Sequence, residues 1–113
     1  MDIGGTDTTL KSSYPSNVAA LVVLGYFYMK YPSGRFENDD LDNLDGRKEF
    51  FFYTSEEAQD RWNTHGWTEN FGKEMFHVIT EKGESSKSDV TIVHEDRDDL
   101  DFPEIESLLN QKF

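Results

Sequence analysis

The most regular pattern of hydrophobic and polar positions lies between Lys48 and Trp67. Four consecutive aromatic residues, Phe50 to Tyr53, place bulk on both faces of an extended segment, which is typical of a strand covered on both sides. Thr54 and Glu57 then have the spacing of a capping box, which marks the start of a helix. The sequence therefore predicts a strand followed directly by a helix.

The longest apolar stretch, Val18 to Tyr31, favours a second strand because it is rich in β-branched and aromatic residues. Gly25 would form a bulge or bend in it. A short buried helix from Asn17 to Leu24, ended by Gly25, is the alternative, since periodicity does not separate the two in a short apolar run. Residues 1–17 are rich in Gly, Ser, Thr and Asp, and are predicted to form a flexible N-terminal tail.

Two further strands are predicted in the C-terminal half of the chain. Gly72–Thr80 carries apolar side chains on both faces, and Asp89–His94 places Val90 and Ile92 on one face. The polar segment Glu81–Ser88 would connect these strands as an antiparallel hairpin.

Two helices complete the predicted elements. In the helix after Thr54, Ala58 and Trp62 would share one face, and Gly66 would end it. A last helix would begin near Asp101, with Pro103 in its first turn. Its apolar face would consist of Ile105, Leu108 and Leu109.

The resulting order is strand, strand, helix, strand, strand, helix (ββαββα). Antiparallel connections dominate this order, so we expect an α+β fold: an antiparallel sheet of about four strands with two helices packed on one face. Residues 18–113 would form one small domain, which is ordinary for this length.

The composition narrows the classes of function. The chain has 113 residues and a net charge of −12, from 23 acidic and 11 basic residues, which opposes direct binding of nucleic acid or anionic membranes. It has no cysteine, which excludes disulfides and thiolate chemistry. The apolar run Val18–Leu24 is too short to span a bilayer. We therefore expect a cytoplasmic protein, in the host cytoplasm if it is encoded by a phage.

No metal site, and hence no cofactor, is predicted. The Asp-rich segment Asp40–Gly46 fails the register of an EF-hand, because Leu41 and Phe52 would occupy ligand positions. Weak calcium binding by the clustered aspartates is the alternative. In the absence of cysteine, only three histidines could provide nitrogen ligands for zinc, and their spacing in the sequence matches no known zinc site. His77 and His94 lie in neighbouring predicted strands and could meet across the hairpin, where we expect a packed or partly exposed histidine pair and not a metal site.

No catalytic residue is predicted, and the chain is interpreted as a non-enzyme. Serine and threonine are concentrated in residues 1–17 and 81–88, without a G-x-S-x-G turn. Carboxylates are numerous but lie in solvated runs, whereas acid–base catalysis needs carboxyl groups in contrasting environments.

The distribution of charge is the feature that points toward a function. Residues 37–46 and residues 95–113 each carry a net charge of −5, so ten of the twelve excess negative charges lie in two short segments. Aspartates at adjacent or alternate positions approach the charge density of duplex DNA, about one charge per 1.7 Å. Two converging runs would form a surface that imitates a phosphate backbone.

In size, acidity and lack of cysteine the chain resembles the small inhibitors used by phages and mobile elements: anti-CRISPR, anti-restriction and host-polymerase-inhibiting proteins. The resemblance implies a DNA or RNA mimic that occupies the nucleic-acid groove of a basic target protein. The predicted partner-binding residues are Glu37, Asp39, Asp40, Asp42, Asp45, Glu95, Asp96, Asp98, Asp99 and Asp101.

The alternative is a small accessory or assembly module that binds a partner, or itself as a homodimer, through an apolar aromatic surface. An edge strand, or Tyr26, Tyr28 and Tyr31, would provide the contact. Trp67 follows the predicted helix and is a candidate aromatic anchor if it is exposed.

Overall fold

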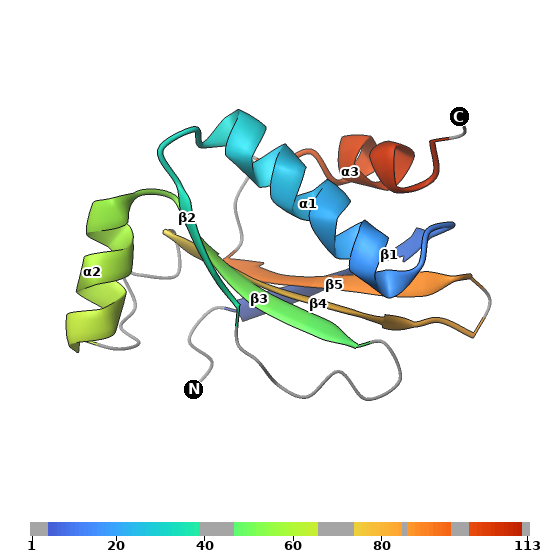
Figure 1. Cartoon of the computed structure of the whole chain (residues 1–113), viewed down its shortest axis with the longest axis horizontal. Coiled ribbons are helices and arrows are strands. Elements are labelled where there is room, and N and C mark those ends of the chain that lie inside the picture. The colour runs from blue at the N-terminus through green and yellow to red at the C-terminus, as the bar shows by residue number, and fades with distance from the viewer. Residues whose placement is uncertain (1–4, 39–46, 66–73, 85, 96–99, 112–113) are drawn as a thin grey trace.

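The computed structural model describes residues 5–38, 47–65, 74–84, 86–95 and 100–111. Within them the chain forms strands and helices in the order βαββαββα (Figure 1). The strands are β1 (Gly5–Ser12), β2 (Arg35–Asn38), β3 (Lys48–Tyr53), β4 (Met75–Lys82) and β5 (Ser88–Glu95). The helices are α1 (Ser16–Lys30), α2 (Glu56–His65) and α3 (Phe102–Leu109).

The strands form one antiparallel sheet of five strands in the order β1-β5-β4-β3-β2. Strands β2 to β5 follow one another as a meander, and β1 adds beside β5. Although β1 and β2 are consecutive strands in the sequence, they occupy opposite edges, so α1 crosses one face of the sheet between them (Figure 1). The predicted α+β class is confirmed, with one more strand and one more helix than expected.

The N-terminal third differs most from the prediction. Gly5–Ser12 forms β1, paired along its length with β5, where the sequence predicted a flexible tail. The predicted strand at Val18–Tyr31 is wrong, because residues 18–30 belong to α1 and Tyr31 is its C-cap. The helical alternative named the right element but ended it at Gly25, whereas α1 continues to Lys30 with open space around Gly25.

The main core lies between the sheet and the helices α1 and α3, which cover the same face (Figure 1). At its centre the ring of Phe27 stacks on Phe52 and Phe76, with centroid distances of 5.2 and 4.7 Å. The buried positions of α1 recur at intervals of three and four residues, as expected for a helix with one packed face. They are Ser16, Ala19, Ala20, Val23, Tyr26 and Phe27.

Helix α2 packs against the other face of the sheet, where β3 ends at Tyr53 and β4 begins at Met75. The shared face of Ala58 and Trp62 is confirmed, since both pack with Tyr53 and Met75 in a second cluster. The helix is capped by the Ser55 hydroxyl, which accepts a hydrogen bond from the Ala58 amide at 3.1 Å, one residue later than predicted. The predicted stop at Gly66 lies outside the described residues.

The C-terminal elements agree with the sequence. The antiparallel hairpin of β4 and β5 is confirmed, and Val90 and Ile92 are both fully buried on the face covered by α1. In α3 the Asp101 side chain accepts from the Glu104 amide at 3.1 Å, and Pro103 lies in the first turn. Because these signals are local, they were readable from the sequence.

Candidate binding surface

Most of the predicted acidic surface lies outside the described residues. Glu37, Glu95 and Asp101 are within them, although for Glu95 only the backbone is described, paired with Gly5. The predicted residues outside the described part are Asp39, Asp40, Asp42, Asp45, Asp96, Asp98, Asp99 and the candidate anchor Trp67.

Among the predicted partner-binding residues, the side chains of Glu37 and Asp101 are described, and both have hydrogen-bond partners within the protein. The Glu37 carboxylate accepts hydrogen bonds from the Tyr53 hydroxyl and from Nε2 of Gln59 at 3.2 Å, so it joins β2 to β3 and α2. Burial, and then the negative charge of Glu37, raise the pKa of Tyr53 above its ordinary value. Asp101 caps α3, and its own amide donates to the Tyr26 hydroxyl at 3.2 Å. The Glu37 carboxylate therefore links three elements, whereas the Asp101 carboxylate caps its own helix.

The strands that precede the two acidic runs are not neighbours. Strand β2 leads into residues 39–46 and β5 leads into residues 96–99, with β3 and β4 between them. Since every pairing is antiparallel, β2 and β5 point in opposite directions. In the described part of the chain, the two acidic runs therefore begin at opposite ends of the sheet.

The two histidines do not meet, so the predicted packed pair is wrong. His77 pairs with Val93 across the hairpin, which places His94 on the opposite face of the sheet. His94 is buried under α3, where Thr8 Oγ1 lies 2.9 Å from its Nε2 and the ring of Phe102 packs at 4.9 Å. It is a histidine with partners in the core.

On the face of the sheet opposite α1, a polar cluster surrounds Glu49, which is only 6% exposed. Its carboxylate is bonded to the imidazole of His77 and to Nη1 of Arg47, the latter at 3.1 Å. Arg47 also lies 3.5 Å from Glu81, and the ring of Phe51 stacks on His77 at 4.4 Å. Within the described ranges, no group of three His, Cys, Asp or Glu side chains is placed to hold a metal ion. The cluster links β3 to β4.

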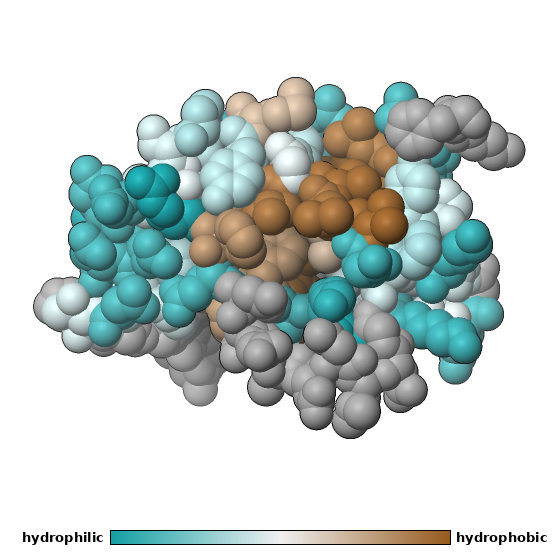
Figure 2. Space-filling view, in the orientation of Figure 1, coloured by the Kyte–Doolittle hydropathy of each residue, from teal (hydrophilic) through white to brown (hydrophobic). Residues whose placement is uncertain are grey.

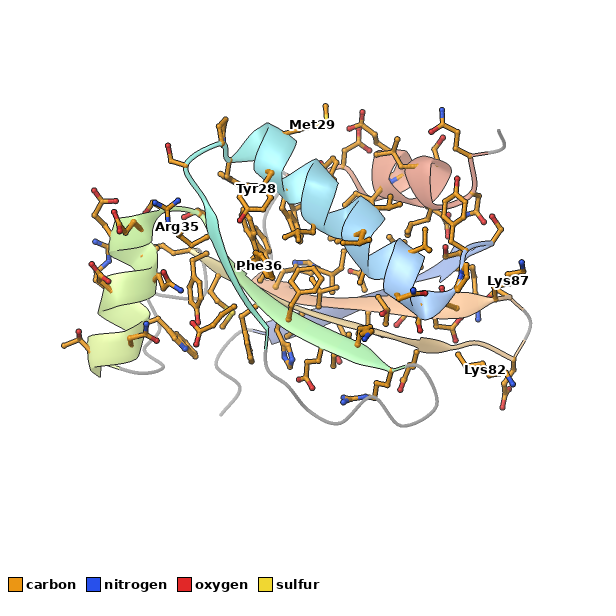
Figure 3. The ribbon with its side chains drawn as sticks, viewed as in Figure 1. Tyr28, Met29, Arg35, Phe36, Lys82 and Lys87 are labelled. Carbon is orange, nitrogen blue, oxygen red and sulfur yellow. The ribbon has the colours of Figure 1, made fainter. Side chains whose placement is uncertain are left out.

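The least expected surface is apolar and lies over α1 and β2. We use the term apolar surface for the large hydrophobic side chains exposed there. Figure 2 shows hydrophobic residues gathered over α1, with hydrophilic residues on either side. Leu21 is 67% exposed and Met29 is 83% exposed, and Met29 projects from the outer side of the helix (Figure 3). The members are Val18, Leu21 and Met29 of α1 and Phe36 of β2.

A groove of about 260 Å³ lies between Leu21 and Phe36, whereas Met29 lies on the side of α1 near Glu104 and Leu108 of α3. Ala20, Leu21 and Leu24 form its α1 side, and Phe36 and Phe50 form its β2 and β3 side. Phe36 is 46% exposed and meets Phe50 edge to face at 6.5 Å, so the open side of its ring is held in place. The groove offers an apolar side chain a partly enclosed position.

Sequence reasoning placed none of these residues in a site. The alternative prediction named Tyr26, Tyr28 and Tyr31, but Tyr26 is buried and the other two are half-buried against Phe52, at 5.2 and 6.3 Å. Of the exposed hydrophobic residues of α1, Val18 and Leu21 precede those tyrosines, and Met29 follows Tyr28. Once α1 is assigned as a helix, its unbroken apolar sequence is itself the signal, because one side must face away from the sheet.

Comparisons with known proteins assign neither a family nor a function to this chain. The chain matches no family model, no curated protein and no solved structure. None of the helices in the described residues has the length and apolarity to cross a membrane. Any proposal about function is therefore based on the surfaces of the chain itself.

Proposed function

We propose that this protein is a non-enzymatic interaction module that binds protein through its apolar surface. The observation that carries the proposal is the exposure of Leu21 and Met29 on a helix without a charged residue between Ser16 and Met29. A helix that is apolar on all sides is normally buried on all sides. Exposed apolar residues that gather around a groove, as Leu21 and Phe36 do here, mark sites of association.

The neighbourhood of α1 supports this interpretation. Protein interfaces are enriched in aromatic residues and Met at their centre and are polar at their rim. Phe36 and Leu21 line the groove, which Lys48 borders, and Met29 lies further along α1, next to Lys30. A partner would thus meet an apolar centre surrounded by charge.

The polar cluster gives no comparable support for catalysis. The Glu49 carboxylate already has two partners in Arg47 and His77, and it lies almost completely buried. A general base must reach a substrate proton, whereas these bonds hold the carboxylate within the sheet. We therefore attribute a structural role to the cluster.

The experiment is affinity capture with wild-type protein and two matched variants, followed by a high-salt wash. Leu21→Lys introduces a charge into the apolar surface, and Asn63→Lys introduces the same charge on the exposed side of α2. We expect proteins retained by the wild type at high salt to be lost with Leu21→Lys and kept with Asn63→Lys. Equal retention by both variants would refute the proposal.

A second candidate function is the acidic inhibitor that imitates DNA or RNA in the groove of a basic target, as anti-CRISPR and anti-restriction proteins do. It is favoured by the concentration of ten of the twelve excess negative charges in two short segments. Such binding would weaken steeply as salt rises, while binding through the apolar surface would not.

Charge reversal separates the two candidates. Replacing Asp39, Asp40 and Asp42 by Lys should abolish capture of a nucleic-acid enzyme, and competing DNA should displace that enzyme from the wild type. The control replaces Glu56, Glu57 and Asp60 of α2, which carry the same total charge outside the two runs. Loss with both triple variants would indicate a general charge effect and not a mimic.

A further inference from the structure

We propose that the apolar surface binds a second copy of this chain, through antiparallel pairing of the two β2 strands about a two-fold axis at Phe36. The two five-stranded sheets would then form one continuous sheet, with both α1 helices on the same side. This inference rests on the proposed interaction function and names its partner.

The free edge of β2 has the hydrogen-bonding groups in the required place. The Thr54 amide donates to the Glu74 carbonyl at 2.9 Å, so in β3 the even-numbered residues bond toward β4 and the odd-numbered ones toward β2. The register then directs the backbone groups of Arg35 and Glu37 to β3. The N–H and C=O of Phe36 point away from β3, to the side where β2 has no strand neighbour among the described residues.

Two-fold pairing at this residue makes the strand complementary to itself. With Phe36 opposite Phe36 of the copy, both backbone groups of each residue can exchange hydrogen bonds. Arg35 then lies opposite Glu37 of the copy, twice, and opposite charges at directly paired positions stabilise a sheet. A shift by one residue would place Phe36 opposite Glu37 and remove both ion pairs. The register with Phe36 on the axis is therefore preferred.

The side chains agree with this arrangement. Phe36 pairs with Phe52, which lies under α1, so the Phe36 ring is on the same face of the sheet as α1. Joining the β2 edges brings the two grooves side by side on that face, with Leu21 and Phe36 of each copy facing the other. The burial of these exposed side chains would accompany the backbone pairing.

Net charge gives the dimer an unusual salt dependence. Each copy carries a charge of −12, so two copies repel each other at long range. Salt screens this repulsion, while the apolar contacts are not weakened by it. We expect self-association to tighten as salt rises, the reverse of binding to a basic partner.

The experiment is analytical ultracentrifugation over a wide concentration range, at low and high salt. We expect a monomer–dimer equilibrium for the wild type, shifted toward dimer at high salt. Phe36→Pro removes an N–H that faces outward, so β2 still pairs with β3, but the dimer should be lost. Arg35→Glu should weaken the dimer by about fivefold or more, because like charges would then face each other twice.

Rescue by the reciprocal change gives the decisive result. The double variant Arg35→Glu, Glu37→Arg restores opposite charges across the axis. Because Glu37→Arg also removes the acceptor of Tyr53 and Gln59, Glu37→Arg alone is the matched control, and the double variant should associate more tightly than either single variant. A dimer that is insensitive to Phe36→Pro and to the charge exchange would overturn the proposed pairing. A wild type that is monomeric at every concentration and salt would overturn the second copy as partner. In that case Leu21-dependent capture of another protein would still support the proposed function.

Discussion

The carboxylate of Glu49 and the imidazole of His77 are hydrogen-bonded between β3 and β4, on the face of the sheet opposite α1. Only 5% of the Glu49 side chain is exposed, although the next four residues of β3 are all aromatic. A carboxylate in such surroundings is stable only when its oxygens have partners, which His77 and Arg47 provide. The pair fixes how β3 lies against β4.

Glu49→Ala is expected to lower the free energy of unfolding by about 2–3 kcal/mol, because it leaves His77 and Arg47 without their shared acceptor. Equilibrium urea denaturation measures this change. Glu81→Ala is the control: Glu81 also lies near Arg47, at 3.5 Å, but 54% of its side chain is exposed. It should change stability by less than about 1 kcal/mol. Equal losses of unfolding free energy in the two variants would contradict the prediction that the buried carboxylate contributes more than the exposed one.

Two glycines should respond in opposite ways to the same substitution. A Cβ at Gly34 would lie 2.8 Å from Cε1 of Phe52 and 2.9 Å from the Tyr53 carbonyl oxygen, so Gly34→Ala should destabilise by about 1–3 kcal/mol. Nothing lies within 4 Å of a Cβ at Gly25, inside α1. Gly25→Ala should therefore stabilise by about 0.5–1 kcal/mol. Thermal unfolding compares the two, and a loss of stability in both would be evidence against a continuous α1.

Tyr53 should make stability fall at alkaline pH. Burial and the nearby Glu37 charge favour its neutral form in the folded state, which raises its pKa above the ordinary value near 10. The contribution is fully present below about pH 10 and is lost as pH rises further, since the unfolded chain ionises first. Tyr53→Phe should cost about 1 kcal/mol at neutral pH and reduce this alkaline loss. Urea denaturation at a series of pH values tests the prediction, and an unchanged pH profile would contradict it.

The Asp101 cap can be tested separately from its charge. Asp101→Ala removes the acceptor of the Glu104 amide and should destabilise by about 1 kcal/mol. Asp101→Asn keeps an acceptor and removes the charge, so its loss should be clearly smaller. If both variants lose the same stability, charge and not capping is the source of the effect. Thermal unfolding of the isolated protein is sufficient for this comparison.

The elements that could be predicted from the sequence are those fixed by near neighbours. The aromatic run of β3, the hairpin of β4 and β5, and the cap of α3 depend on alternation or on spacings of a few residues. Strand β1 could not be predicted in this way. Its residues are mostly polar, with Leu10 as the buried hydrophobic side chain, and its partner β5 lies at the other end of the chain.

The full length of α1 and the exposed apolar residues on it were missed for one common reason. Helical periodicity is visible when polar residues separate the buried positions, but here Val18, Leu21 and Leu24 occupy the positions between them. Two of these residues, Val18 and Leu21, belong to the apolar surface, and Leu24 lines its groove. Phe36 was missed because an edge strand of four residues has little pattern of its own.

The path of α1 from one edge of the sheet to the other also affects how the chain is made. Thr9 of β1 pairs with Thr91 of β5, 82 residues later in the sequence. At synthesis rates of about 5–20 residues per second, β1 leaves the ribosome roughly 4–16 s before its neighbour exists. During that interval the newly made α1 segment has no finished sheet to cover. We therefore expect the yield of folded protein to depend on how fast the last third of the chain is translated.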